Sequence, residues 1–154
     1  TVIRMGGEKC GCGRRGCCEA YASATALIRD TKRAMEKHPE SLMNEIAKKE
    51  GKVTGRTAFD AMNAGDKTAK ALVSRYIRCV GEGLVNIGNY IRPEIIFMGG
   101  GISNQGDWFI KRLQAYVTRY SYGGKRNPYI KVVKATLKNE AGILGAAALV
   151  AKSS

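Results

Sequence analysis

The most informative segment of this 154-residue sequence reads Cys10-Gly11-Cys12-Gly13-Arg14-Arg15-Gly16-Cys17-Cys18-Glu19. Three of its cysteines, Cys10, Cys12 and Cys17, can converge on one metal ion, because the glycines between them let the backbone turn tightly enough to aim the sulfurs inward. A structural Zn²⁺ site has four protein ligands, so Cys18 or a histidine from elsewhere must complete the set. Two adjacent cysteines rarely reach the same ion. The segment therefore predicts a zinc loop over residues 10–19.

The same segment matches the pattern C-x-C-G-x-x-G-C-x-E, and this pattern resembles the signature of the ROK family of bacterial sugar kinases and sugar-responsive repressors. The resemblance implies that the three cysteines bind zinc together with a histidine from a preceding E-x-G-H motif. It also implies that Glu19 contacts the hydroxyls of a sugar. No E-x-G-H motif occurs here, and Thr1 stands about where it would have ended. We therefore expect the sequence to be a fragment whose fourth zinc ligand lies upstream.

Composition limits the remaining classes of protein. The chain is 44% hydrophobic, enough for one buried core, and its longest weakly polar run, residues 141–151, is too short to span a membrane. Four of the five cysteines fall within nine residues, a spacing that suits a metal better than disulfides and predicts a reducing cytoplasm. The net charge of +13 invites a nucleic-acid interpretation, but the basic residues are scattered along the chain, which argues against direct nucleic-acid binding.

Apolar residues recur at helical spacing in the first half of the chain. They predict a helix over residues 18–37, with Glu19 in its first turn, and a short helix over 42–49 that Gly51 stops. Thr57 is expected to cap a brief third helix. Asp66 is expected to cap the longest helix, whose apolar stripe belongs to the core. His38 precedes a proline, so we expect it at an exposed helix end and away from the zinc loop.

The second half of the chain contains a strand that leads into glycines. Residues 94–98 predict a buried strand, Gly99, Gly100 and Gly101 follow it, and a helix is expected over 105–119. Bare backbone N–H groups at such a turn can lie against a nucleotide because no Cβ intervenes; a plain tight turn is the alternative. The order Pro-x-x-Ile-x-x-Gly-Gly-Gly is similar to the adenosine-side motif of ROK and other actin-like kinases. This resemblance implies ATP contact over residues 98–103.

Three further elements are expected toward the C-terminus: a loop over residues 116–129, a strand over 130–133 and a small-residue helix over about 140–151. The last resembles the closing helix of the family, which packs near the nucleotide.

These patterns predict an α/β chain, and the resemblance places residues 1–154 as the C-terminal lobe of a two-lobed sugar kinase with the actin-like ATPase (ribonuclease H-like) fold. The implied activity is transfer of the γ-phosphoryl of Mg-ATP to the 6-hydroxyl of a hexose, with glucose as the first candidate. Neither the family's catalytic aspartate nor its phosphate loop can be assigned here, so the fragment alone is expected to be inactive. The family also suggests a homodimer.

Two rival functions stay open at this stage. One is the sugar-binding effector domain of a ROK-type transcriptional repressor. The other is a basic zinc-knuckle module that binds nucleic acid.

Overall fold

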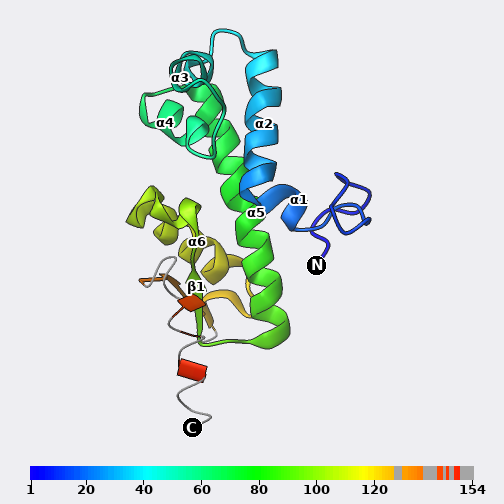
Figure 1. Ribbon diagram of the computed structural model, residues 1–154. Helices are drawn as coiled ribbons and strands as arrows, with labels where there is room; N and C mark the ends of the chain where they lie inside the picture. The colour runs from blue at the N-terminus through cyan, green and yellow to red at the C-terminus, as the bar shows by residue number, and fades with distance from the viewer. Residues whose placement is uncertain (127–129, 137–141, 144, 146–147, 150–154) are drawn as a thin grey trace.

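The computed structural model describes residues 1–126, 130–136, 142–143, 145 and 148–149 (Figure 1). Its elements follow one another as α1 (Glu19–Ala22), α2 (Ala24–Lys37), α3 (Leu42–Glu50), α4 (Thr57–Asn63), α5 (Lys67–Ile91), β1 (Ile95–Met98), the 3₁₀ helix η1 (Gly101–Gln105), α6 (Asp107–Tyr120), the 3₁₀ helix η2 (Gly124–Arg126) and β2 (Lys131–Lys134).

Helix α5 runs the length of the molecule, with α2 along its upper part and α6 along its lower part (Figure 1). It begins as predicted at Asp66, whose carboxylate accepts a hydrogen bond from the Ala69 N–H at 2.7 Å. The other carboxylate oxygen of Asp66 accepts from Ser41 Oγ and Leu42 N, so the same side chain ties α3 to α5. The predicted apolar stripe of α5 is buried over most of its length.

An aromatic group holds α4, α5 and α6 together. Phe59 of α4 is fully buried, and its ring packs against Tyr76 of α5 and against Trp108 and Phe109 of α6, with centroids 6.0 to 6.5 Å apart. Such tilted and edge-to-face pairs add specificity to the area they bury. Helices distant in sequence therefore share a single core.

The first predicted helix is divided in two, which corrects the expected continuous helix over 18–37. Ser23 has an extended backbone, and its hydroxyl accepts from the Ala26 N–H at 3.0 Å, so it caps α2 instead of continuing α1. Tyr76 then donates from its hydroxyl to the Ala22 carbonyl at the end of α1. Thr57 does not cap α4 as predicted; its hydroxyl accepts from Thr54 N in the preceding loop.

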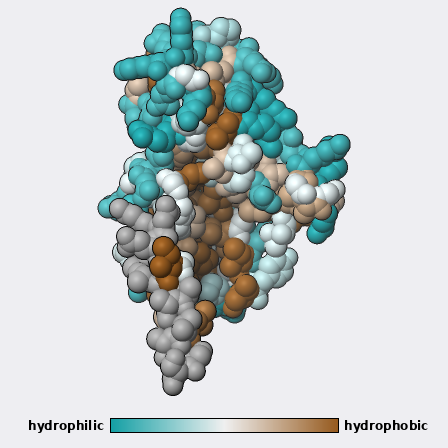
Figure 2. Space-filling view, in the orientation of Figure 1, coloured by the Kyte–Doolittle hydropathy of each residue, from teal (hydrophilic) through white to brown (hydrophobic). Residues whose placement is uncertain are grey.

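Among the described residues, the sheet consists of two parallel strands, β1 and β2, paired from Ile95 with Lys131 to Met98 with Lys134. The prediction that residues 94–98 form a buried strand is wrong on burial, because Ile95 is 43% exposed and Phe97 is 66% exposed. Only alternate side chains of β1, those of Ile96 and Met98, pack against the helical core, whereas those of Ile95 and Phe97 are exposed. Figure 2 shows apolar surface on the lower half of the molecule, below a largely polar upper end.

A side chain occupies the outer edge of β2. Gln114 of α6 donates from Nε2 to the Ile130 carbonyl at 3.0 Å and accepts from the Val132 N–H at 2.8 Å. These backbone groups point away from β1, whose own bonds to β2 involve Lys131 N and Ala135 N. The amide of Gln114 therefore takes the place of a neighbouring strand.

The end of the chain differs from the prediction in two respects. The expected helix over 105–119 begins at Asp107, after η1, and continues to Tyr120, so part of the predicted loop over 116–129 is helical. Of the predicted closing helix over about 140–151, residues 142–143, 145 and 148–149 are described and are helical, and the rest lies outside the described residues. Within the described part of the chain, no helix combines the length and apolar character needed to cross a bilayer.

Candidate functional site

Residues 1–18 form a compact loop, which we call the knuckle, on one flank of α5 (Figure 1). Gly13 and Gly16 adopt positive φ angles of +84° and +78°, the left-handed conformation that glycine tolerates best. The Gly16 carbonyl accepts from both Ile3 N and Arg4 N, and a Cβ at this position would lie 1.7 Å from the Arg4 carbonyl oxygen. Glycine is thus required at residue 16 by the chain's own packing.

These turns bring three sulfur atoms together. The ligand atoms of Cys10, Cys12 and Cys17 all lie within 4.8 Å of one another, and the sulfurs of Cys12 and Cys17 are 3.6 Å apart. Tetrahedral zinc with Zn–S bonds of about 2.3 Å places its sulfurs about 3.8 Å apart, so the spacing fits this metal. The predicted convergence of the three cysteines is present.

The adjacent cysteine has a different role. A Cβ built on Gly83 of α5 would lie 2.5 Å from Cys18 Sγ, so this thiol packs on α5 and is not part of the cluster. His38 lies at the exposed C-terminal end of α2, where it contacts Glu40. Among the described residues, the cluster contains three ligands and no fourth.

The thiols of the cluster differ in acidity. At Cys10, a hydrogen bond from the Cys12 backbone lowers the pKa, but the neighbouring Cys12 and Cys17 thiols and partial burial outweigh it and raise the pKa to about 11. At Cys12, a hydrogen bond from the Arg14 backbone and bonds from the other two thiols lower the pKa. The lowered pKa of Cys12 favours its thiolate, the form of cysteine that binds a divalent cation.

The knuckle is attached to the helices through Glu8. Its carboxylate pairs with Arg33 of α2 at 2.6 Å, and its backbone N–H donates to the Tyr21 hydroxyl of α1 at 2.6 Å. Arg33 also lies 3.8 Å from Asp30, which in turn pairs with Arg75 of α5 at 2.7 Å. The cysteine cluster is therefore held in a fixed place beside α1, α2 and α5.

Glu19 is the first residue of α1, a four-residue helix in which the N–H groups of Ala20, Tyr21 and Ala22 already donate to the Cys17 and Cys18 carbonyls. Its side chain is exposed, and within the part of the chain that the structure describes its carboxylate accepts a single long hydrogen bond, of 3.6 Å from Cys10 Sγ to Oε2. Most of the hydrogen-bonding capacity of this carboxylate is therefore open to other donors next to the cysteine cluster.

Gly99, Gly100 and Gly101 are exposed and follow the carboxyl end of β1. Gly100 has a φ of +82°, and a Cβ added at Gly100 or Gly101 would have no heavy atom within 4 Å. Ser103, which is buried, donates from its hydroxyl to the Gly100 carbonyl at 2.7 Å and fixes the turn. The turn opens into the five-residue η1 and not directly into α6, so the expected N-terminus of a long helix lies farther along the chain.

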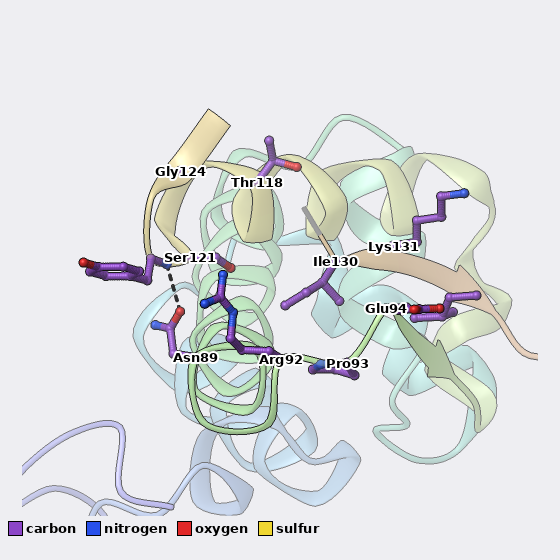
Figure 3. Close-up of a pocket in the computed structure, with 12 residues that line it drawn as sticks. Asn89, Arg92, Pro93, Glu94, Thr118, Ser121, Gly124, Ile130 and Lys131 are labelled. Atoms are coloured by element: carbon purple, nitrogen blue, oxygen red, sulfur yellow. Dashed lines mark hydrogen bonds between the residues drawn. The ribbon is translucent and has the colours of Figure 1, made fainter. Parts of the chain in front are cut away.

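The structure adds two clefts that sequence reasoning missed, and neither is lined by Glu19 or by the three glycines. One, of about 670 Å³, lies between the knuckle, α2 and α5 and includes Glu8, Arg33 and Arg75. The other, of about 510 Å³, lies where α5 ends and both strands begin, and Figure 3 shows its lining. The sequence does carry one signal for the second cleft: Arg92 stands directly before Pro93, and the residue before a proline disfavours helical backbone.

Three of the aspartates considered at the sequence level have structural partners. Asp30 is ion-paired with Arg29 and Arg75, Asp60 lies 3.7 Å from Arg56, and Asp66 caps α5. Asp107 is the first residue of α6. Of these four aspartates, only Asp30 lines a cleft, and its carboxylate is ion-paired with arginines. None of the four is therefore placed as a free general base.

Comparison with known proteins identifies relatives of nearly the whole chain. The ROK family model matches residues 1–153. Glucokinases of Halalkalibacterium halodurans and Thermotoga maritima are each 34% identical over 97% of this chain, which corresponds to 45% and 47% of those proteins. A xylose repressor of Caldicellulosiruptor bescii is 26% identical over 97% of the chain and 37% of its own length. The chain thus spans about half the length of the curated glucokinases it matches.

Solved structures agree with this result. A ROK family glucokinase from Streptomyces griseus, in complex with glucose and AMPPNP, superposes with a TM-score of 0.83 at 30% identity, over 97% of this chain and 49% of that one. A ROK hexokinase from Thermus thermophilus gives a TM-score of 0.75 at 32% identity, over 96% of this chain and 45% of that one. These neighbours have the actin-like ATPase fold, which confirms the predicted fold class.

Proposed function

Because this chain belongs to the ROK family, we propose that it is the C-terminal part of an ATP-dependent hexose kinase that transfers the γ-phosphoryl of Mg-ATP to the 6-hydroxyl of glucose. The observation that carries the proposal is the 34% identity to glucokinases over nearly the whole chain. The likeness to a glucokinase that holds glucose and AMPPNP supports the same assignment.

In this proposal, Cys10, Cys12 and Cys17 hold a structural zinc ion, and a ligand beyond the described residues completes the site. Bound zinc would cross-link the knuckle. The chain itself then fixes the base of α1 through Glu8, Tyr21 and Arg33, so that Glu19 is presented in one orientation. An ionised carboxylate with few hydrogen bonds of its own is a suitable acceptor for sugar hydroxyls.

We assign Gly99, Gly100 and Gly101 to the nucleotide. Their support is the open space around Gly100 and Gly101, which lets a ligand approach the backbone closely. Phosphoryl transfer also needs a base at the acceptor hydroxyl and charge stabilisation at the phosphates. Asp30 and Asp60 are ion-paired with arginines, and Asp66 caps α5. These structural roles support the further proposal that this chain alone does not catalyse the reaction.

The kinase assignment is tested in the full-length protein that contains this chain. Glu19→Gln should raise the KM for glucose by tenfold or more while leaving the KM for ATP within twofold, because the neutral amide loses a charged acceptor at the sugar only. Glu36→Gln is the matched control, since Glu36 is an exposed carboxylate on α2 outside both clefts. Absence of ATP-dependent glucose phosphorylation in the full-length wild type would reject the proposal.

The metal assignment is tested by elemental analysis of the purified protein. We expect one zinc per chain in the wild type and loss of at least 90% of it in Cys12→Ser. Cys79→Ser is the control, because Cys79 lies on α5 outside the cluster and should retain the full zinc content. Equal zinc in both variants would contradict the assignment.

The repressor relatives give the second candidate function, a sugar-binding effector domain of a transcriptional regulator. ATP binding by the full-length protein favours the kinase, whereas sugar binding without ATP binding favours the regulator. We also propose a homodimer, supported by the exposed apolar side chains of β1, and a cytoplasmic location, supported by five unpaired cysteines.

A further inference from the structure

The cleft at the end of α5 lies away from the proposed sugar and nucleotide positions. Its walls include Ile95 and Lys131, which are the first residues of β1 and β2. The glycine turn follows the last residue of β1, so the two places are separated by the length of a four-residue strand, about 13 Å. A ligand in this cleft would therefore be distinct from a nucleotide at the glycine turn.

Arg92 lines this cleft in a backbone conformation that arginine rarely adopts. It ends α5 with φ 49° and ψ 53°, and it is the only non-glycine residue with positive φ in the described part of the chain. This conformation costs a residue with a Cβ about 1 to 2 kcal/mol, and glycine or asparagine would adopt it more readily. Strain of this kind is concentrated at functional positions.

The guanidinium of Arg92 is available to a ligand. Arg92 is exposed, and across the described residues no carboxylate lies within 4 Å of its guanidinium and its side chain forms no hydrogen bond. The acid that lines the cleft, Glu94, lies beside Lys131, whose backbone N–H donates to the Glu94 carbonyl. Figure 3 shows Arg92 extending toward the opposite end of the cleft, where Ser121 lies.

Ser121 supplies a second polar group without a partner. Among the described residues, its buried Oγ finds no hydrogen-bond partner, while its backbone N–H donates to the Val117 carbonyl and its carbonyl accepts from Gly124 N. A buried polar atom left in this way costs about 1 to 3 kcal/mol. Asn89 holds the neighbouring backbone in place by accepting from Tyr122 N at 2.8 Å. The hydroxyl is therefore fixed on the wall that Arg92 faces.

From this arrangement we propose that the cleft binds the phosphate group of a small phosphorylated metabolite between the Arg92 guanidinium and the Ser121 hydroxyl. A guanidinium presents paired N–H donors that match two phosphate oxygens, and a hydroxyl can donate to a third. The volume of about 510 Å³ is larger than an inorganic ion needs and lies in the range of sites for small metabolites. Ile95, Pro93 and Ile130 provide an apolar wall for the carbon skeleton.

The test is calorimetric titration of the full-length protein that contains this chain with inorganic phosphate and with glycerol 3-phosphate, at constant ionic strength set with chloride. Arg92→Asn should weaken binding of both at least tenfold without lowering the melting temperature of the free protein, because asparagine relieves the backbone strain. Ser121→Ala should weaken binding similarly, and it also removes the unpaired hydroxyl. Lys37→Gln, which deletes one positive charge from the other cleft, should leave both affinities within twofold.

Malonate serves as the carboxylate probe and should bind at least tenfold more weakly than phosphate. Equal affinity for malonate would overturn the assignment to phosphate. Undiminished phosphate binding in Arg92→Asn or Ser121→Ala, or no phosphate binding by the wild type, would overturn the proposal. If Arg92→Asn does not fold, Ser121→Ala decides the question. None of these measurements depends on kinase activity, so they are independent of the proposed function.

Discussion

The half of the molecule that contains the knuckle and α1 to α5 is closed, whereas the half that contains β1, β2 and the glycine turn is open. Phe59 in the first half is fully buried, but Phe97 in the second is 66% exposed. Gly16 in the knuckle has no room for a side chain, whereas Gly100 has no neighbour within 4 Å of an added Cβ, although both have positive φ.

The difference shows that the same residue type can serve two purposes in one chain. A packed glycine is required by the protein's own backbone, while an open glycine leaves space beside the backbone for something else to approach. Packed positions of the closed half, such as Phe59 and Gly16, should therefore respond to substitution mainly through stability. The open half should respond mainly through binding.

The sharpest way to break this comparison is to truncate the two phenylalanines. Phe59→Ala should lower the free energy of unfolding by about 3 to 5 kcal/mol, because it leaves a cavity among three helices. Phe97→Ala should change it by less than about 0.5 kcal/mol, as is usual for exposed positions. Urea denaturation followed by circular dichroism measures both. Similar losses in the two variants would mean that the second half is as well packed as the first.

A smaller effect is expected from the two glycines. Gly16→Ala forces a Cβ into the Arg4 carbonyl and should cost about 2 kcal/mol more than Gly100→Ala, which bears only the cost of positive φ. Gly16→Ala should also reduce zinc retention, while Gly100→Ala should not. Thermal unfolding and elemental analysis of the two variants provide the measurements. Equal destabilisation by the two substitutions would show that the Arg4 carbonyl does not exclude a side chain at residue 16.

The smallest effect concerns Asp66, which links two helices of the closed half. Partial burial raises its pKa, but hydrogen bonds from Ala69, Ser41, Leu42 and Thr68 outweigh this and hold the pKa below the usual 3.8. The resulting stability is present above the unfolded pKa, near 4, and is lost as the pH falls through the lower folded value. Asp66→Asn should cost about 1 kcal/mol at pH 7.

The same variant should show a shallower loss of stability below pH 4 than the wild type. Urea midpoints between pH 2 and pH 7 measure this slope. Glu36→Gln, an exposed carboxylate on α2, serves as the control and should keep the wild-type slope. Identical acid slopes in Asp66→Asn and the wild type would contradict the role of this carboxylate.

Features whose causes are local in sequence could be predicted. Asp66 caps α5 as expected because its side chain reaches the backbone three residues ahead, and the three cysteines converge because glycine turns lie between them. Ser23 was harder, since a serine can either continue a helix or cap the next one, and contacts with the rest of the fold decide between these. The roles of Glu19 and of the three glycines stay predictions.

Properties that depend on distant partners could not be read from the sequence. The apolar run of β1 correctly indicated a strand, but its burial depends on which elements lie against it, and Phe97 has no cover among the described residues. The cleft at Arg92 was missed for the same reason, because α5, α6 and β2 contribute to it from separate parts of the chain.

The hydrogen bonds of Gln114 determine which edge of the sheet can accept a further strand. With Ile130 and Val132 already bonded to this side chain, the margin of β2 cannot recruit another β-segment without displacing the glutamine. The opposite edge of the sheet, along Ile95 and Phe97 of β1, is not paired with another strand in the part of the chain described. Any polypeptide that enlarges the sheet, whether from the same protein or from a second copy, must therefore dock alongside β1.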